Sequence, residues 1–223
     1  MDGIIVVDKP PGITSHDVVQ FIRRKFSVKK VGHSGTLDPM ATGVLVVLLG
    51  RCTRLFPRFS NFDKEYQATL TLGLETETGD VQGKIRKEFA FEKVDEKSIE
   101  EVFRKFTGEL EQVPHMFSAL KFKGRKLYQL ARKGVAVTLK PRRVHIYNLR
   151  LVRFNPPDIE FSIHCSKGTY IRKLAEDIAR SLGTRGCLSS LRRISNGSFN
   201  IREAIRLEEV NEGHIRHWTG ETV

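Results

Sequence analysis

A tight turn that leads into a wholly apolar run restricts the fold of this chain more than any other feature. The turn is Gly32-His33-Ser34-Gly35-Thr36-Leu37-Asp38-Pro39-Met40-Ala41-Thr42-Gly43, and the run is Val44–Leu49. Because proline fixes its own φ and restricts the preceding residue, the Asp-Pro pair fixes the backbone on both sides of the Asp38 carboxylate. Aspartates in turns commonly cap the backbone. Here the fixed carboxylate, five residues after His33, indicates a reactive group, and the apolar run predicts a buried strand.

The length and the cysteines narrow the class of protein. The 223 residues can form one large domain or two modest subdomains. The longest apolar run is too short to cross a bilayer and no signal peptide is evident, so we expect a cytoplasmic protein. Cys52, Cys165 and Cys187 are odd in number and widely spaced, which argues against a disulfide framework and a zinc site. We therefore expect no metal.

The distribution of charge predicts a polyanionic partner. The formal net charge is +12, and the 46 residues from Gln112 to Pro157 contain no Asp or Glu. The basic residues of this stretch are Lys121, Lys123, Arg125, Lys126, Arg132, Lys133, Lys140, Arg142, Arg143, Arg150 and Arg153. A solvated surface normally mixes both signs, whereas charge of one sign over such a length is typical of nucleic-acid binding.

Hydrophobic spacing predicts an α+β protein. Strands are predicted near residues 4–7, 44–49, 66–72, 144–154 and 159–165, and helices near 18–26, 99–106, 127–133, 171–182 and, at the tail, 202–211. Adjacent strands mixed with separate helices favour a mixed, largely antiparallel sheet flanked by helices. We expect a single domain over residues 1–223, with a basic insertion at about 114–141 that grips RNA.

Two further segments are candidates for the site. Lys9-Pro10-Pro11-Gly12-Ile13-Thr14-Ser15 is typical of a strand–turn–helix junction, and we expect it to support the Asp38 turn. Thr14-Ser15-His16-Asp17 resembles a capping box, which predicts the start of the helix that follows. Ser166-Lys167-Gly168-Thr169-Tyr170-Ile171-Arg172 joins a strand to the clearest helix. Burial raises the pKa of a carboxyl group, and a nearby guanidinium offsets that effect. The sequence therefore predicts an ion pair between Asp38 and Arg172, with a solvated Arg172 as the alternative.

Together these segments resemble the TruB-type pseudouridine synthases, which isomerise a uridine in the T loop of tRNA. The Asp38 turn is similar to the family's catalytic motif. Further matching motifs follow family order at Lys9–Ser15, Pro114–Arg132, Ser166–Arg172 and Leu191–Phe199. The resemblance implies the pseudouridine synthase catalytic fold, with an active-site cleft and a thumb-like insertion. Such enzymes usually continue into a C-terminal PUA domain, which we do not expect in this chain.

The resemblance also implies roles for single residues. Asp38 would be the nucleophile, oriented and kept charged by Arg172. The substrate-binding residues would be His33, Tyr66, Tyr170 and Leu191. His33 would fill the hole left by the flipped uridine, and Tyr66 would stack on the base and assist proton transfer. Tyr170 would lie beside the base, and Leu191 would pack against the uracil. Without the resemblance, each residue has an ordinary alternative. His33 could simply form a hydrogen bond within its turn, Tyr66 could face the core, and Leu191 could belong to ordinary helix packing.

The implied reaction converts uridine to pseudouridine at position 55 of the T loop by base flipping and covalent catalysis, without a cofactor. Whether Asp38 attacks C6 or C1′ stays open. We expect a monomer that binds the T-arm stem-loop, with RNA contacts at Lys121, Arg125, Arg132 and Arg143. One alternative is the catalytic subunit of a guide-RNA-directed rRNA pseudouridine synthase. Another is a non-catalytic RNA-binding or RNA-folding module.

Overall fold

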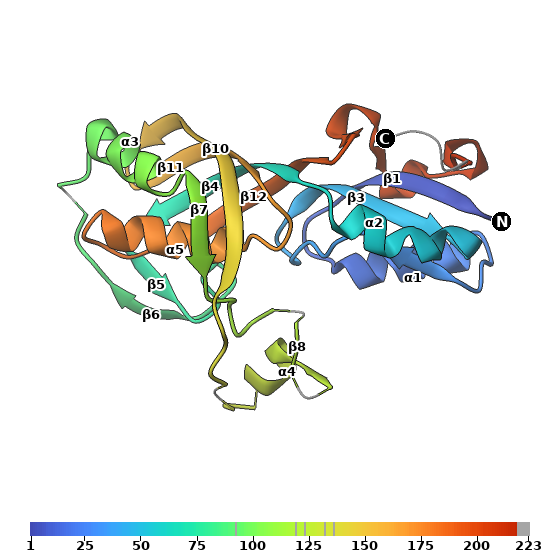
Figure 1. Ribbon diagram of the computed structural model, residues 1–223, viewed down its shortest axis with the longest axis horizontal. Coiled ribbons are helices and arrows are strands. Elements are labelled where there is room, and N and C mark those ends of the chain that lie inside the picture. Colours follow the sequence, from blue (N-terminus) through green and yellow to red (C-terminus); the bar gives the residue numbers. More distant parts are fainter. Residues whose placement is uncertain (92, 119, 123, 132, 136, 218–223) are drawn as a thin grey trace. The chain divides into compact units, whose positions relative to one another are not determined.

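The computed structural model describes residues 1–91, 93–118, 120–122, 124–131, 133–135 and 137–217, without the side chains of Lys121 and Lys126. The chain forms two compact units (Figure 1). The terminal unit combines Met1–Gln67 with Ser190–Val223, and the central unit is Ala68–Ser189. The strands β4 (Lys64–Leu72) and β12 (Gly186–Asn196) contain the two boundaries. Among the described residues, no helix has both the length and the apolar character needed to cross a membrane.

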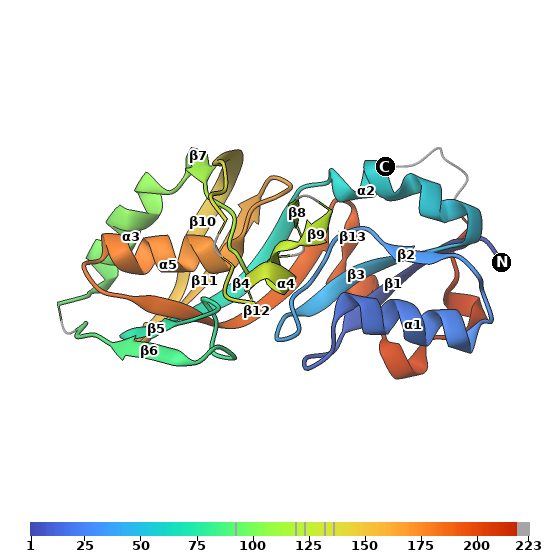
Figure 2. The same cartoon turned by 90° about the horizontal axis from the view of Figure 1, so that it is seen from below.

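The terminal unit is built on the antiparallel pair β1–β3. The elements described in this unit are β1 Gly3–Lys9, α1 Ser15–Lys25, β2 Val31–His33, β3 Thr42–Leu49, η1 Gly50–Leu55, α2 Phe56–Ser60, β13 Phe199–Asn200, η2 Ile201–Glu203, β14 Ile205–Arg206, η3 Leu207–Glu209 and η4 Glu212–His214. Alternate residues of β1 and β3 form a core with Phe59 and Phe199. Helix α1 packs against β2 with its buried face of Val18, Val19 and Ile22 (Figure 2).

The end of β12 lies parallel to the start of β3, with Arg193 opposite Gly43. Gly43 has a φ of +99°, and a Cβ atom built on it would lie 2.2 Å from the carbonyl oxygen of Arg193. Only glycine therefore allows β12 to approach β3 this closely. This contact brings the side chains of β12 to the turn that precedes β3.

The central unit is built on the long hairpin β10–β11, and β7 pairs antiparallel with the first residues of β10. Its elements are β5 Leu74–Thr76, β6 Ile85–Glu88, α3 Glu96–Lys105, β7 Gly108–Gln112, β8 Lys121–Phe122, β9 Arg125–Lys126, α4 Leu127–Ala131, β10 Arg142–Asn155, β11 Asp158–Cys165 and α5 Ile171–Ser181. Helices α3 and α5 pack against each other, and α3 packs on β10 (Figures 1 and 2). Phe103 of α3 meets Phe161 of β11 edge to face, with ring centroids 5.8 Å apart.

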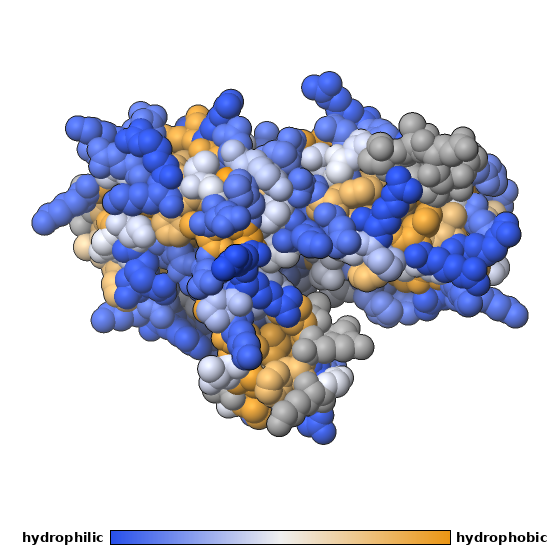
Figure 3. Space-filling view, in the orientation of Figure 1, coloured by the Kyte–Doolittle hydropathy of each residue, from blue (hydrophilic) through white to orange (hydrophobic). Residues whose placement is uncertain are grey.

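The insertion, residues 114–141, leaves the central unit between β7 and β10 (Figure 1). It contains the small hairpin β8–β9 and the short helix α4. Figure 3 shows apolar surface on it beside hydrophilic surface, and the exposed apolar residues here include Phe122 and Val135. The predicted basic segment is therefore partly apolar on its surface, which charge alone did not indicate.

The predicted fold class is confirmed, and one predicted element is wrong. In the terminal unit β1–β14 and β3–β12 are parallel and β1–β3 is antiparallel, whereas the pairs within the central unit that involve β10 are antiparallel. The sheet is thus mixed and largely antiparallel, with flanking helices. The tail does not form the predicted helix over residues 202–211, because the side chain of Asn200 caps a single 3₁₀ turn and Ile205 then pairs with β1.

Candidate active site

The turn that carries Asp38 lies between β2 and β3 and is fixed by its own backbone. Asp38 is half-buried, and its carbonyl oxygen accepts a hydrogen bond from the N–H of Ala41 at 3.0 Å. The next carbonyl, of Pro39, accepts from the N–H of Gly12 at 2.8 Å. The Asp38 turn is thereby tied to the turn that follows β1, which is the supporting role predicted for the Lys9–Ser15 segment.

Helix α1 holds the residue before the carboxylate. The hydroxyl of buried Ser15 accepts from the N–H of Leu37 at 2.8 Å and donates to the carbonyl of Leu37 at 3.1 Å. Thr14 caps the helix and Asp17 completes its capping box, as the sequence predicted. The helix start therefore fixes both polar backbone groups of the residue next to Asp38.

Strand β12 holds the opposite side of the turn. Arg193, almost wholly buried, donates from Nε to the carbonyl of Val44 at 2.7 Å and from Nη2 to that of Gly35 at 3.1 Å. Buried Asn196 donates to the hydroxyl of Ser34 at 2.8 Å. Arg193 therefore brings a buried positive charge to this turn.

Lys9 adds a second buried cation. Its Nζ donates to the carbonyls of Pro10 and Pro39, at 2.8 and 3.3 Å. Burial lowers the pKa of Lys9 to about 8, against the attraction of the Asp38 carboxylate, which raises it, while the Arg193 charge lowers it further. The nucleophile predicted from sequence thus lies within electrostatic reach of the buried Lys9 ammonium, and the two groups attract each other.

The other predicted residues of the terminal unit are not fully exposed. His33, at the end of β2, is half-buried, and its Nδ1 accepts from the N–H of Gly35 at 3.3 Å. Tyr66 is 8% exposed, on the buried side of β4, and Leu191 is 7% exposed, on β12. Leu191 therefore lies on a strand, and the helix packing considered for it is wrong. The substrate contacts of these three residues stay predictions.

Arg172 lies in the first turn of α5 in the central unit, and Tyr170 is the N-cap, as predicted. The Arg172 side chain is buried and donates to the carbonyls of Thr78 and Phe117, each at 2.8 Å. Its Nη1 lies 3.5 Å from Oδ2 of buried Asp80. Arg172 is thus not the solvated arginine of the alternative. The Asp38–Arg172 ion pair would join the two units and stays a prediction.

Asp80 is not among the residues that the sequence predicted for the site. Its Oδ1 accepts from the hydroxyl of Thr78 at 2.6 Å and from the N–H of Gln82 at 3.1 Å, which leaves Oδ2 toward Arg172. The turn is fixed at both sides to β12, since Leu188 bonds with Gly79 and Val81. A Gly-Asp turn is common, so no signal in one sequence could have marked it.

The predicted RNA contacts lie on or near the insertion. Arg125 of β9 and Arg143 of β10 are exposed. Arg143 is opposite the exposed Glu111 of β7, which offers it a partner of opposite charge. The side chain of Lys121 and the whole of Arg132 lie outside the described residues.

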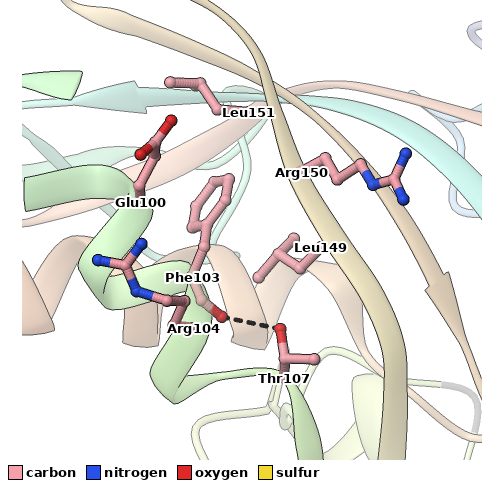
Figure 4. Close-up of a pocket in the computed structure, with 7 residues that line it drawn as sticks. All are labelled: Glu100, Phe103, Arg104, Thr107, Leu149, Arg150 and Leu151. Carbon is pink, nitrogen blue, oxygen red and sulfur yellow. Dashed lines mark hydrogen bonds between the residues drawn. The ribbon is translucent and has the colours of Figure 1, made fainter. Parts of the chain in front are cut away.

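A groove of about 340 Å³ between α3 and β10 is a separate feature (Figure 4). Phe103, Leu149 and Leu151 make it apolar, and Glu100, Arg104 and Arg150 give it charges of both signs. None of the residues predicted for the site lines this groove. It is therefore not part of the candidate active site.

Comparison with known proteins identifies the family of this chain. The family described as TruB family pseudouridylate synthase (N terminal domain) matches residues 23–171, and that described as tRNA pseudouridylate synthase B C-terminal domain matches 172–221. The chain is 46% identical to the tRNA pseudouridine synthase B of Clostridium tetani over 98% of this chain and 75% of the relative. It is 48% identical to that of Syntrophotalea carbinolica, over 94% and 69%.

Solved structures agree. A chain in the crystal structure of a Cbf5-Nop10-Gar1 complex is 31% identical, with a TM-score of 0.72 over 93% of this chain, and this chain spans about half of that one, 53%. The family match extends over well more than half of the chain, and it includes the Asp38 turn and the start of α5. This chain belongs to the TruB family of pseudouridylate synthases.

Proposed function

We propose that this chain isomerises uridine to pseudouridine at position 55 in the T loop of tRNA, with Asp38 as the nucleophile. The observation that carries the proposal is the Asp38 turn, which Ser15, Arg193 and Lys9 hold from three elements of one unit. Relatives that share close to half of its residues are named tRNA pseudouridine synthase B, which supports tRNA as the substrate.

The reaction needs an ionised carboxylate and no redox partner. The N1–C1′ bond breaks, the uracil turns, and C5 bonds to C1′, while C5 releases a proton and N1 takes one up. Covalent attack by Asp38 divides this exchange into easier steps. The buried positive charge of Lys9 attracts the ionised form, and in this proposal Arg172 pairs with Asp38 and fixes its direction.

The remaining predicted residues would hold the flipped nucleotide. Stacking on an aromatic ring is a common way to bind a splayed base, which suits Tyr66, with Tyr170 beside the base. Leu191 would give an apolar wall, and His33 would occupy the space that the uridine leaves in the loop. Arg125 and Arg143 would contact phosphates of the T arm.

The test is Asp38→Asn on an unmodified tRNA transcript labelled with tritium at C5 of uridine, because pseudouridine formation releases that hydrogen to water. We expect tritium release to fall below detection while binding of the transcript persists. Asp95→Asn is the matched control, since Asp95 is an exposed helix cap and asparagine caps equally well. Tritium release by Asp38→Asn at the wild-type rate would overturn the proposal.

The same assay separates the alternatives. A guide-RNA-dependent subunit would not modify a bare transcript, and an RNA-binding module would bind the transcript without releasing tritium. A transcript with cytidine at position 55 tests the position, because the wild-type enzyme should then release no tritium from the T loop.

A further inference from the structure

Gln112 holds the residue that begins helix α5. Its side-chain Nε2 donates to the carbonyl of Tyr170 at 3.1 Å, and its Oε1 accepts from the N–H of Tyr170 at 2.8 Å. Gln112 is the last residue of β7 and is 5% exposed. A side chain here binds the backbone of the α5 N-cap in the way that a neighbouring strand would. Tyr170 in turn precedes Arg172 by two residues.

The chain returns to the same helix five residues later. The carbonyl of Phe117 accepts from Nη2 of Arg172 at 2.8 Å. Between these contacts, the half-buried His115 accepts from the N–H of Phe117 at Nδ1 over 3.1 Å, and its Nε2 lies 3.8 Å from Oε1 of Glu176 on α5. Segment 112–117 thus contacts α5 at residues 170, 172 and 176.

This segment is also the start of the insertion. Gln112 ends the last strand before the insertion, and Phe117 lies within it. Behind the contacts, the turn at Gly79 leaves little room, because a Cβ on Gly79 would lie 2.7 Å from Oε1 of Glu176 and 3.6 Å from Nε2 of His115. Glu176 of α5 and His115 at the root of the insertion therefore both lie beside this turn.

We propose that Gln112 is a positioning residue for Arg172. Its amide fixes the N-terminal end of α5 relative to the root of the insertion, so that RNA held by the insertion and the Arg172 guanidinium keep a constant relative position. This inference rests on the proposed function, because it gives Arg172 a part in the reaction. Gln112 itself does not contact the reacting atoms in this proposal.

The amide is suited to this role because it both donates and accepts. Gln112→Met keeps the length of the side chain and removes both hydrogen bonds. Gln112→Glu keeps the acceptor for the N–H of Tyr170 but places a charged oxygen against the carbonyl of Tyr170 at neutral pH. Protonation of the carboxylate that Gln112→Glu introduces restores a donor, so the effect of this substitution should depend on pH.

The experiment measures single-turnover rates, transcript affinity and melting temperature of the full chain. We expect Gln112→Met to lower the rate by about tenfold to a hundredfold, as small displacements of an aligned group do, with affinity changed by less than about twofold. The matched control is Gln20→Met in the terminal unit, where the amide also makes two side-chain contacts, with His16 and Arg23. It should leave the rate unchanged.

The readout that a purely structural role would not produce is non-additivity with Arg172→Lys. If Gln112 acts through Arg172, Gln112→Met should change the rate less than about twofold in the Arg172→Lys background.

Gln112→Glu should recover toward the wild-type rate as the pH falls from 7 to 5. An equal loss in both backgrounds, or a Gln112→Met enzyme with the wild-type rate, overturns the inference. Should Gln112→Met not fold, the pH series of Gln112→Glu decides, and a flat series overturns it. A wild-type rate for Arg172→Lys would instead count against the proposed role of Arg172.

Discussion

The side-chain hydroxyl of Ser15 forms hydrogen bonds with both backbone groups of Leu37: it accepts from the N–H at 2.8 Å and donates to the carbonyl at 3.1 Å. Both residues are buried, so water cannot replace either bond. Since Leu37 is the residue before Asp38, these two hydrogen bonds help to fix the backbone from which the Asp38 carboxylate projects. The first residue of α1 is therefore part of the support for the candidate nucleophile.

Ser15→Ala should lower both stability and turnover. Removing the hydroxyl leaves the N–H and carbonyl of Leu37 without that partner in a buried site, which should cost about 2 kcal/mol of the free energy of unfolding. Urea unfolding measures the first effect and single-turnover tritium release the second. Ser60→Ala is the control, because its hydroxyl bonds the Pro57 carbonyl at an exposed site. If Ser15→Ala matches this control in both measurements, the two hydrogen bonds between Ser15 and Leu37 do not support Asp38.

Lys9 should give the rate a pH dependence above neutrality. Because its folded pKa is lowered to about 8, Lys9 loses its charge near that pH, and the Asp38 turn then loses a positive charge that attracts and holds the carboxylate. We expect the single-turnover rate of the wild type to decline as the pH rises from 7 to 9. Lys9→Met should be slower at pH 7 and should show a flatter profile. If Lys9→Met shows the same decline in rate as the wild type, a group other than Lys9 causes the decline.

The same lowered pKa has an opposite consequence for stability. Between about pH 8 and the ordinary value of 10.5, the unfolded chain keeps a proton on Lys9 that the folded chain has lost. The contribution of Lys9 to the free energy of unfolding therefore rises with pH across this window. The measurement is the free energy of unfolding by urea at pH 8 and at pH 10. Between these two values, the free energy of unfolding should rise less, or fall more, in Lys9→Met than in the wild type.

Local signals in the sequence predicted the elements that carry the site. The Thr14–Asp17 capping box predicted the start of α1, and the alternation from Tyr66 to Leu72 agrees with the burial of β4. Apolar spacing placed Arg172 in the first turn of α5. These features depend on residues close together in the chain, so spacing alone reveals them.

Contacts over long sequence separations were not predictable in the same way. Arg193 binds the carbonyl of Val44, 149 residues away, and Gln112 binds Tyr170, 58 residues away. Both side chains contact backbone groups, which leave no mark in the partner's residue type. The tail was mispredicted as a helix because its spacing is compatible with one, whereas pairing of Ile205 with β1 decides its structure.

Asp80→Asn should lower turnover more than RNA affinity. Asparagine can still accept from Thr78 and Gln82 at Oδ1, but its NH₂ group would face the Arg172 guanidinium in place of a carboxylate. The guanidinium keeps its bonds to the carbonyls of Thr78 and Phe117 and loses the opposite charge of Asp80, so we expect a rate loss of about tenfold to a hundredfold. Asp158→Asn, which keeps the acceptor for Thr71, is the control. An Asp80→Asn enzyme with the wild-type rate and a weaker affinity would place Asp80 in RNA binding instead.

Arg125→Gln should reduce the salt dependence of transcript binding, and Arg143→Gln should reduce it less. Each phosphate contact contributes about 0.7 to 0.9 to the slope of log affinity against log salt concentration. Arg125 is exposed on the insertion, whereas Arg143 lies opposite Glu111, which competes with phosphate for the guanidinium. Affinities at several salt concentrations measure the slopes. Arg206→Gln, at an exposed arginine of the terminal unit that lies 4.0 Å from Glu209, is the matched control and should leave the slope unchanged. Equal slopes for Arg125→Gln and the wild type would show that the insertion holds RNA through contacts other than this arginine, and the apolar surface around Phe122 would be the next to test.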